Sequence, residues 1–263
     1  MDAMEQYIFQ CGAVSLEDIA QEFNISTNTV RRDIQELLGR NNNIKKVYGG
    51  VAANTEFPSP YADRSAEHHR NKEEIGCLAA RFVDDGEAIF LDSGPTTPCI
   101  VKYLKNRKNI TVITNSLSVM TECALYPHIT LITLGGVYDS CIAAFMGTIP
   151  LEALSRFSIK TVFLEAAGVS ICAGLTNDTY MEAEMKRAVS KAGERCILLA
   201  DGAKFGQAAA VKFYSFNDLY AIVTDRPPAQ TYVEISEKFG IQLLYPNAEG
   251  QGQIVGNTYG SSD

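Results

Sequence analysis

Residues 15–38 decide the organisation of this chain, and they read SLEDIAQEF (15–23), NIS (24–26) and TNTVRRDIQELL (27–38). Apolar residues recur at helical spacing on both sides of the three-residue turn, namely Leu16, Ile19, Ala20 and Phe23 before it and Val30, Ile34, Leu37 and Leu38 after it. Ser15 with Asp18 resembles a capping box, and Ser26 is an N-cap candidate for the second helix. Two short amphipathic helices joined in this way predict a helix-turn-helix whose second helix enters a DNA major groove.

The second helix and the segment after it carry the residues that we expect to meet DNA. Burying the apolar stripe turns Thr27, Asn28 and Arg31 outward, toward base edges. Residues 44–51 then read as a strand and tight turn, a wing that carries two lysines toward phosphates. The predicted DNA-binding residues are Ser26, Thr27, Asn28, Arg31, Arg32, Lys45, Lys46 and Tyr48. A local ion pair with Asp33 on a solvated face is the alternative role for Arg32.

Composition sets limits on the partners of the chain. The 263 residues carry a net charge of −8, which argues against a general nucleic-acid coat. Residues 24–51 nevertheless hold five Arg and Lys against two Asp and Glu, so 5 − 2 = +3 locally. A small basic patch on an acidic body fits a specific DNA reader. No apolar run approaches the ~20 residues that cross a bilayer, and no leader is visible, so we expect a cytoplasmic protein without a membrane partner.

The cysteines and histidines indicate neither a disulfide framework nor a metal centre. Seven scattered cysteines include no Cys-x-x-Cys, which favours reduced, packing thiols. Three histidines occur without metal-ligand spacing, and the pair His68-His69 reads as solvated surface rather than as a metal site or switch. We therefore expect neither a metal nor an organic cofactor.

From about residue 71 the pattern changes to apolar strands that alternate with helices, which predicts a parallel α/β sheet. The strands are expected at 87–91, 109–114, 129–134, 161–164, 196–200 and 220–224. The predicted organisation is a DNA-binding domain over residues 1–55, a linker over 56–70, an α/β domain over 71–246, and a disordered Gly- and Ser-rich tail over 247–263.

Four of these strands are followed by small, polar or charged residues. The segments are 92–97 (DSGPTT), 114–116 (TNS), 135–136 (GG) and 201–206 (DGAKFG). Ligands of open α/β sheets bind beyond the carboxyl ends of the strands, and backbone N–H groups there can hold an anion. Each loop alone also fits an ordinary strand-to-helix turn. Together, with Lys186 and Lys204 as sources of charge, they favour a phosphorylated ligand.

The chain resembles the DeoR family of bacterial transcriptional repressors over about residues 5–246. The motifs are Val30-Arg-Arg-Asp-Ile34 and Ile44-Lys-Lys-Val-Tyr-Gly-Gly50 in the first part, and 90–97, 112–116, 134–136, 174–176, 186–187 and 199–206 in the second. The resemblance implies a winged helix-turn-helix joined to a sensor domain with a fold like that of ribose-5-phosphate isomerase. It also implies operator DNA as a partner, a phosphorylated sugar as the effector that weakens DNA binding, and a homodimer or homotetramer.

Carried over position by position, the effector contacts are Asp92, Ser93, Gly94, Thr96, Thr97, Asn115, Gly136, Lys186, Asp201 and Lys204. The chain departs from the family pattern at Pro95, at Glu165-Ala-Ala-Gly168, which lacks a polar residue at Ala167, and at Ala203. These departures leave the DNA role intact and bear on the identity of the effector. The arm before the first helix is also short.

Two other functions fit parts of the pattern. Asp92, Glu165 and Asp201 are of the type that serves as acid or base, so a sugar-phosphate isomerase with a vestigial DNA-binding domain is one alternative. A winged domain that binds a protein partner is another. The exposed Asn28, Arg31, Lys45 and Lys46 argue against the second. The expected function is a non-enzymatic regulator, a repressor of a sugar-metabolism operon that a phosphorylated sugar releases.

Overall fold

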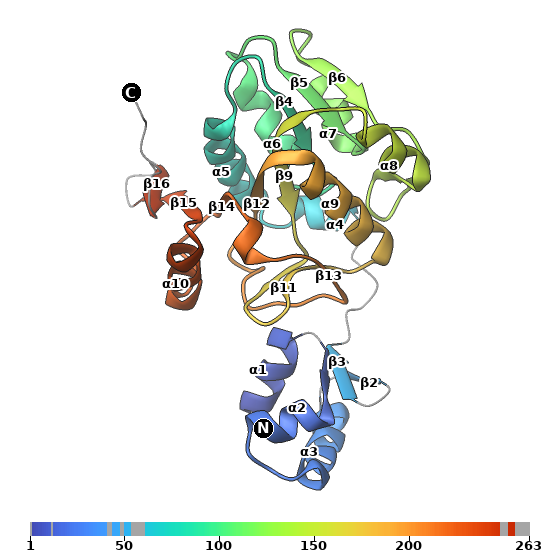
Figure 1. Cartoon of the computed structure of the whole chain (residues 1–263), viewed down its shortest axis with the longest axis vertical. Coiled ribbons are helices and arrows are strands. Elements are labelled where there is room, and N and C mark those ends of the chain that lie inside the picture. Colours follow the sequence, from blue (N-terminus) through green and yellow to red (C-terminus); the bar gives the residue numbers. More distant parts are fainter. Residues whose placement is uncertain are drawn as a thin grey trace.

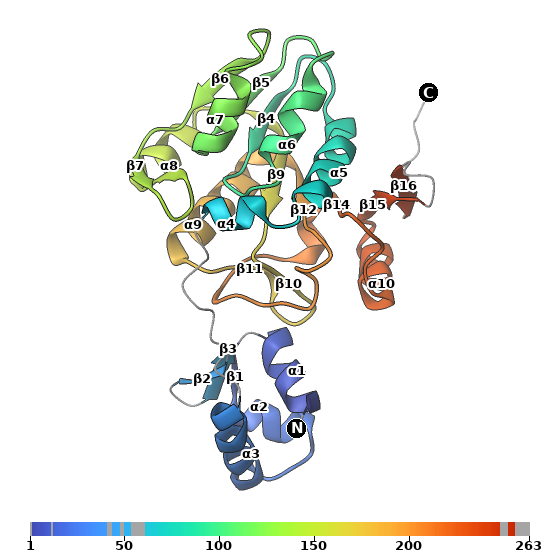
Figure 2. The same ribbon diagram turned by 180° about the vertical axis from the view of Figure 1, so that it is seen from behind.

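The computed structural model describes residues 2–11, 13–40, 44–47, 50–53, 61–247 and 252–255 (Figures 1 and 2). Residues up to 53 form a small domain at one end of the molecule, and residues from 61 onward form a larger α/β domain at the other (Figure 1). This is the α/β fold class, with two domains in the predicted order.

The small domain contains the predicted helix-turn-helix. Helix α2 spans Leu16–Glu22 and helix α3 spans Thr27–Arg40. The Ser15 side chain caps α2 by accepting from the N–H of Asp18 at 3.0 Å, as the capping-box pattern predicts. Strands β1 Ala13–Ser15, β2 Ile44–Val47 and β3 Gly50–Ala53 form an antiparallel sheet in the order β1-β3-β2. The β2–β3 hairpin is the predicted wing.

The core of this domain shows why the pattern of apolar residues predicted it. Val30, Ile34 and Leu37 of α3 are buried against Ile19 of α2. The residues before the helix-turn-helix, expected to be a short arm, form helix α1 (Asp2–Cys11). Met4 and Ile8 of α1 lie one turn apart and enter the same core, so burial of that face stabilises the helix.

The larger domain is built on an eight-stranded sheet in the order β16-β15-β14-β12-β9-β4-β5-β6. The strands are β4 Ala88–Leu91, β5 Thr111–Thr114, β6 Thr130–Thr133, β9 Ile159–Glu165, β12 Gly193–Leu199, β14 Ala221–Val223, β15 Gln242–Pro246 and β16 Gly252–Val255. All neighbours pair in parallel except β15 and β16. The parallel sheet predicted from alternating apolar strands is therefore confirmed, and β15 is an added strand.

Helices cover both faces of this sheet (Figures 1 and 2). Helices α5 His69–Ala79, α6 Pro98–Val101 and α7 Leu117–Cys123 pack on one face, and α8 Thr148–Leu154, α9 Tyr180–Ala192 and α10 Gln230–Phe239 pack on the other. Successive strand residues point to opposite faces, so Phe90 enters one core while Ile89 and Leu91 enter the other. Double coverage explains why the strands read as continuous apolar runs.

Two small antiparallel sheets complete the domain. Strands β10 Gly168–Ser170, β11 Gly174–Asn177 and β13 Val211–Tyr214 form one, in the order β10-β11-β13. Strands β7 Val137–Asp139 and β8 Ala144–Met146 form the other. They were not expected, because strands of three or four residues carry too little alternation to stand out in the sequence.

The predicted linker and tail differ from the structure where it describes them. Helix α4 (Tyr61–Ala66) lies within the expected linker of residues 56–70 and is tied to the larger domain, because the N–H of Tyr61 donates to the carbonyl of Cys141 at 3.0 Å. The expectation of a disordered tail over 247–263 is wrong for residues 252–255. They pair with β15, whose outer edge would otherwise leave ladder hydrogen bonds unmade. The rest of the tail, from 248 to 251 and from 256 onward, lies outside the described residues.

Candidate functional site

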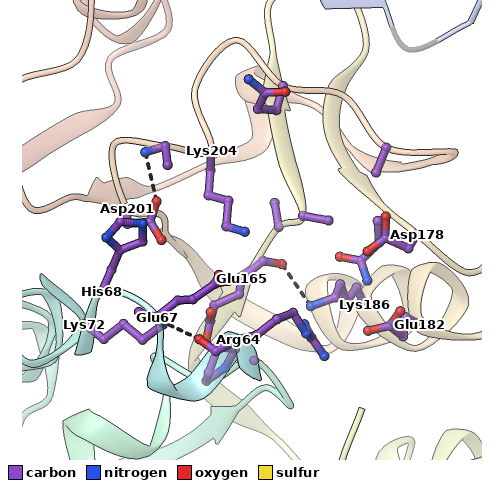
Figure 3. A pocket seen from close by; sticks show the side chains of 18 of the residues that line it. Arg64, Glu67, His68, Lys72, Glu165, Asp178, Glu182, Lys186, Asp201 and Lys204 are labelled. Atoms are coloured by element: carbon purple, nitrogen blue, oxygen red, sulfur yellow. Dashed lines mark hydrogen bonds between the residues drawn. The ribbon is translucent and has the colours of Figure 1, made fainter. Parts of the chain in front are cut away.

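A cavity of about 350 Å³ opens at the carboxyl ends of three neighbouring strands of the central sheet, β4, β9 and β12. Small-molecule sites of open α/β sheets occupy this position, and the volume lies at the lower end of the usual range. Helix α4, the start of α5 and helix α9 complete its walls. The charged and histidine side chains that line it are Arg64, Glu67, His68, Lys72, Glu165, Asp178, Glu182, Lys186, Asp201 and Lys204 (Figure 3).

A buried ion pair joins Lys186, which lines the cavity, to Asp92, which does not. The ammonium group of Lys186, on α9, contacts the carboxylate of Asp92 at the end of β4, and both side chains are nearly inaccessible to solvent, at 4% and 3% exposed. Asp92 also accepts from the N–H of Glu165 at 3.1 Å, and Lys186 donates to the Glu165 carbonyl at 2.9 Å. The pair therefore joins β4, β9 and α9, which lie far apart in the sequence.

The loop after β4 folds around the carboxyl group of Glu165, at the end of β9. Oε1 of Glu165 accepts from the backbone N–H groups of Thr96 at 2.6 Å and Thr97 at 2.9 Å, and Oε2 accepts from the Thr96 hydroxyl at 2.8 Å. A Cβ on Gly94 would lie 2.1 Å from Cδ of Glu165, so a larger residue there would displace the Glu165 carboxyl group from the loop. The Thr97 hydroxyl donates within the loop, to the carbonyls of Asp92 and Gly94.

Burial shifts the pKa values of several cavity groups. It raises the pKa of Glu165, with the neighbouring Asp92 adding to the effect. It also raises the pKa values of Asp178 and Glu182, which both line the cavity near Lys186 (Figure 3). Lys72 shifts in the opposite sense, because burial lowers the pKa of its ammonium group. A water-poor site with opposed charges is typical of a ligand-binding cavity.

The raised pKa of Glu182 predicts a pH dependence of stability. The folded protein holds this proton more tightly than the unfolded chain, so the Glu182 contribution falls as pH rises from 4.5 through the raised pKa. We expect the melting temperature of the wild type, relative to that of Glu182→Gln, to fall across this window. Glu237→Gln is the control, because Glu237 is exposed on α10. A constant difference between wild type and Glu182→Gln over the whole pH range would contradict the prediction.

The structure places the ten predicted effector contacts in two groups. Four of them line the cavity, namely Gly94, Lys186, Asp201 and Lys204. The other six do not line it, namely Asp92, Ser93, Thr96, Thr97, Asn115 and Gly136. Among these, Asn115 donates to the carbonyl of Phe145 at 3.1 Å, and Gly136 has a φ of +137° and lies against the backbone of Met146. Their role as effector contacts stays a prediction.

Sequence reasoning missed the part of the cavity that comes from α4, α5 and the β11–α9 connection. The missed polar lining residues are Arg64, Glu67, His68, Lys72, Asn177, Asp178, Glu182 and Gln207. His68 was expected on the solvated surface; it is exposed, and it lies at the rim of the cavity. Most of these residues carry no local sign, because they lie in segments that do not follow a strand of the central sheet. Gln207 follows β12 but lies just beyond the predicted segment 201–206.

The predicted DNA-binding residues lie on α3 and the wing. The Ser26 side chain caps α3 by accepting from the N–H of Thr29 at 3.1 Å, so its position fixes where the helix begins. Asn28, Arg31, Arg32 and Lys46 are exposed, and Thr27 is half-buried. The backbone of Lys45 lies in β2, and Tyr48 lies outside the described residues. The structure thus presents a polar and basic helix face, and the contacts of the individual residues with DNA stay predictions.

The alternative role weighed for Arg32 is visible. Its Nε lies 3.6 Å from Oδ1 of Asp33, and 82% of its side chain is exposed. Such an exposed pair is weak, contributing at most ~1 kcal/mol, so it leaves the guanidinium group available to DNA phosphate.

Comparison with known proteins decides the family. A family model described as the DeoR-like helix-turn-helix domain matches residues 1–57, and one described as the DeoR C-terminal sensor domain matches residues 67–226. The chain belongs to the DeoR family of transcriptional regulators. It is 36% identical to the HTH-type transcriptional regulator IolR of Bacillus subtilis, over 91% of this chain and 96% of that one. It is 28% identical to the glycerol-3-phosphate regulon repressor of Escherichia coli, over 90% and 94%.

The HTH-type transcriptional repressor GlcR of Bacillus subtilis is a third relative, 27% identical over 92% of this chain and 93% of that one. Among solved structures, the ribose 5-phosphate isomerase from Plasmodium falciparum resembles this fold, with 12% identity, coverage of 72% of this chain and 98% of that one, and a TM-score of 0.42. The enzyme alternative is not supported, because full-length DeoR-family relatives are regulators and repressors.

The described residues of this DeoR-family chain provide neither a cluster of metal ligands nor a membrane-spanning helix. Within the ranges that the structure describes, no group of three or more His, Cys, Asp or Glu side chains is arranged to hold a metal ion. None of the helices described combines the length and the apolar character that crossing a membrane requires. All seven cysteines are free. Cys99, Cys123 and Cys196 are buried and pack in the interior, whereas Cys77, Cys141 and Cys172 are exposed, so the prediction of packing thiols is wrong for these three.

Proposed function

We propose that this protein represses an operon for the metabolism of a sugar or a similar polyhydroxy compound, and that a phosphorylated form of that compound releases it from operator DNA. The observation that carries the proposal is the pairing, in one chain, of a helix-turn-helix with an exposed basic helix face and a charged cavity at the carboxyl ends of β4, β9 and β12. The names of two relatives support the repressor part, since they are called repressors.

The chemistry of the cavity supports a small polar ligand with an anionic group. Lysine, arginine and histidine side chains line it together with carboxyl groups. Lysine donates to phosphate oxygens, and carboxylates accept from sugar hydroxyls. The relative from Escherichia coli is named for the regulon of a phosphate ester, glycerol 3-phosphate.

The test uses the full chain and the DNA upstream of its own operon. Fluorescence anisotropy should show salt-dependent binding to this DNA, because phosphate contacts release counterions. A panel of sugar phosphates, screened first by the rise in melting temperature, should contain a compound that weakens the DNA complex. Turnover of such a compound, or the absence of any operator preference, would overturn the proposal.

The same proposal includes a homo-oligomer in the cytoplasm, a dimer or a tetramer. DNA readers of this type bind two half-sites that mirror protein symmetry. We therefore expect a palindromic or repeated operator in footprinting, and a dimer or larger species in light scattering. A single isolated half-site bound by a monomer would count against this arrangement.

Replacing Lys46 on the wing should change the salt dependence of DNA binding. If Lys46 contacts a phosphate, Lys46→Ala should weaken binding to all DNA sequences alike and reduce the slope of log K against log salt by about 1. Lys105→Ala is the matched control, since Lys105 is exposed on the larger domain. An unchanged slope in Lys46→Ala would remove this lysine from the interface.

A further inference from the structure

The loop of residues 92–97 already holds an acidic group of its own chain. Two backbone N–H groups and the Thr96 hydroxyl converge on the carboxyl group of Glu165 at 2.6–2.9 Å. Converging N–H groups after a strand are the usual way in which such a loop holds a phosphate. In this chain the same donors are satisfied from within the protein. A phosphate group and the Glu165 carboxyl group cannot occupy that position together.

Other groups near this loop also oppose the binding of a phosphate there. The Glu165 side chain packs against Gly94, and its Cδ lies 2.1 Å from the position of a Cβ on that residue. Asp92 is the first residue of the loop, and its carboxylate is bound by Lys186 and by the N–H of Glu165. A ligand phosphate in the loop would therefore displace three hydrogen bonds and approach a second carboxylate.

The lysines that line the cavity differ in what their ammonium groups already bind. Lys72 donates to the carbonyls of Arg64 and Glu67, and Lys186 is bound by Asp92. Lys204 is half-exposed, and across the described part of the chain its ammonium group makes no hydrogen bond or ion pair. Its side chain extends from the loop after β12 toward the middle of the cavity (Figure 3). All three N–H donors of Lys204 are therefore open to an anion, whereas Lys72 and Lys186 each already use two.

The wall formed by Asp178 and Glu182 has the opposite character. Both residues line the cavity, and Glu182 is buried at 6% exposed, with its carboxyl group accepting from the Thr179 hydroxyl at 3.0 Å. Carboxyl groups bind sugar hydroxyls well and repel phosphate. The cavity thus offers the ammonium group of Lys204 to an anion and the carboxyl groups of Asp178 and Glu182 to hydroxyl groups.

We propose that Glu165 closes the loop of residues 92–97 to phosphate, so that Lys204 binds the phosphate of the effector while Asp178 and Glu182 accept its hydroxyl groups. This inference rests on the proposed function, which supplies a phosphorylated effector. It makes Glu165 and Lys204 the residues that determine which anionic ligands this regulator takes and in which orientation.

The experiment measures the melting temperature of the full chain against the concentration of inorganic phosphate. Glu165→Gly vacates the loop, whereas Glu165→Gln removes the charge but keeps a side chain of the same shape that still accepts the N–H groups. Phosphate should therefore stabilise Glu165→Gly through a new site and Glu165→Gln through none. Glu165→Ser is the second variant that vacates the loop, should the glycine substitution prevent folding.

Substitutions of Lys204 separate the two sites. In the wild type, Lys204→Met should weaken phosphate binding about 10- to 150-fold, the loss expected for a hydrogen bond to a charged group, and Lys105→Met should have no effect. In the Glu165→Gly background, phosphate stabilisation should survive Lys204→Met. In the Glu165→Gln background it should not.

Three results would overturn the inference. One is wild-type phosphate binding that survives Lys204→Met but is lost in Thr96→Val, because the loop would then be the phosphate site. A second is that phosphate does not bind to the loop in Glu165→Gly or Glu165→Ser. A third is that phosphate does not bind to the wild type. Failure of the proposed function would give another result. No sugar phosphate would release operator DNA, but phosphate would still stabilise Glu165→Gly through the loop and not Glu165→Gln.

Discussion

Lys186→Met is expected to lower the melting temperature of the larger domain by about 6–20 °C. The substitution leaves the carboxylate of Asp92 buried without its cation, and breaking a buried pair in this way costs about 3–5 kcal/mol. For a domain of this size each kcal/mol lowers the melting temperature by about 2–4 °C. Differential scanning calorimetry of the full chain measures the effect.

Lys191→Met is the matched control for this loss of stability. Lys191 lies on the same helix and is exposed, so its removal should shift the melting temperature little. The double variant Asp92→Asn/Lys186→Met should be more stable than Lys186→Met alone, because it no longer buries an unpaired charge. Equal melting temperatures of Lys186→Met and Lys191→Met would show that the ion pair does not hold the domain together.

Arg31→Ala is expected to weaken operator binding about 5- to 150-fold without changing stability. Arg31 is exposed on α3 in the face that the buried stripe of Val30, Ile34 and Leu37 turns outward. Arginine is the side chain best suited to bind guanine through two hydrogen bonds, and loss of such a contact costs about 1–3 kcal/mol. Fluorescence anisotropy with operator DNA measures the affinity.

A scan of single base changes in the operator tests the specificity of this contact. Binding by Arg31→Ala should become insensitive to the base at one position and keep its preference at the others. Arg156→Ala is the control, since Arg156 is exposed on the larger domain. If Arg31→Ala instead lost the same affinity for every operator variant, Arg31 would be a phosphate contact.

One departure from the family pattern has a structural consequence that the sequence does not show. The sequence marked Glu165-Ala-Ala-Gly168 as unusual because a polar residue is lacking at Ala167. The structure shows that the larger consequence comes from Glu165, whose carboxyl group binds the loop of residues 92–97. That partnership joins residues 69 positions apart, and the sequence contains no local sign of it.

The helix-turn-helix, the wing and the parallel sheet can all be predicted from the order of the residues. Those features rest on periodicity and capping, which depend on neighbours a few residues apart: the stripe of α3, the cap by Ser26 and the apolar strands β4, β5, β9 and β12. The same local logic placed Lys186 and Lys204 among the cavity residues, because each lies beside the end of a strand or on a helix with a readable pattern.

The partner of each charged side chain could be learned from the folded structure and not from the sequence. Lys186 and Glu165 are held inside the protein, Lys204 extends into the cavity, and α4 closes a wall that the sequence assigned to a linker. The reason is physical. Hydrogen-bond donors and charges are satisfied by whichever groups the folded chain brings within about 3 Å, and that set is fixed by how β4, β9, β12 and α9 pack together rather than by their order in the chain.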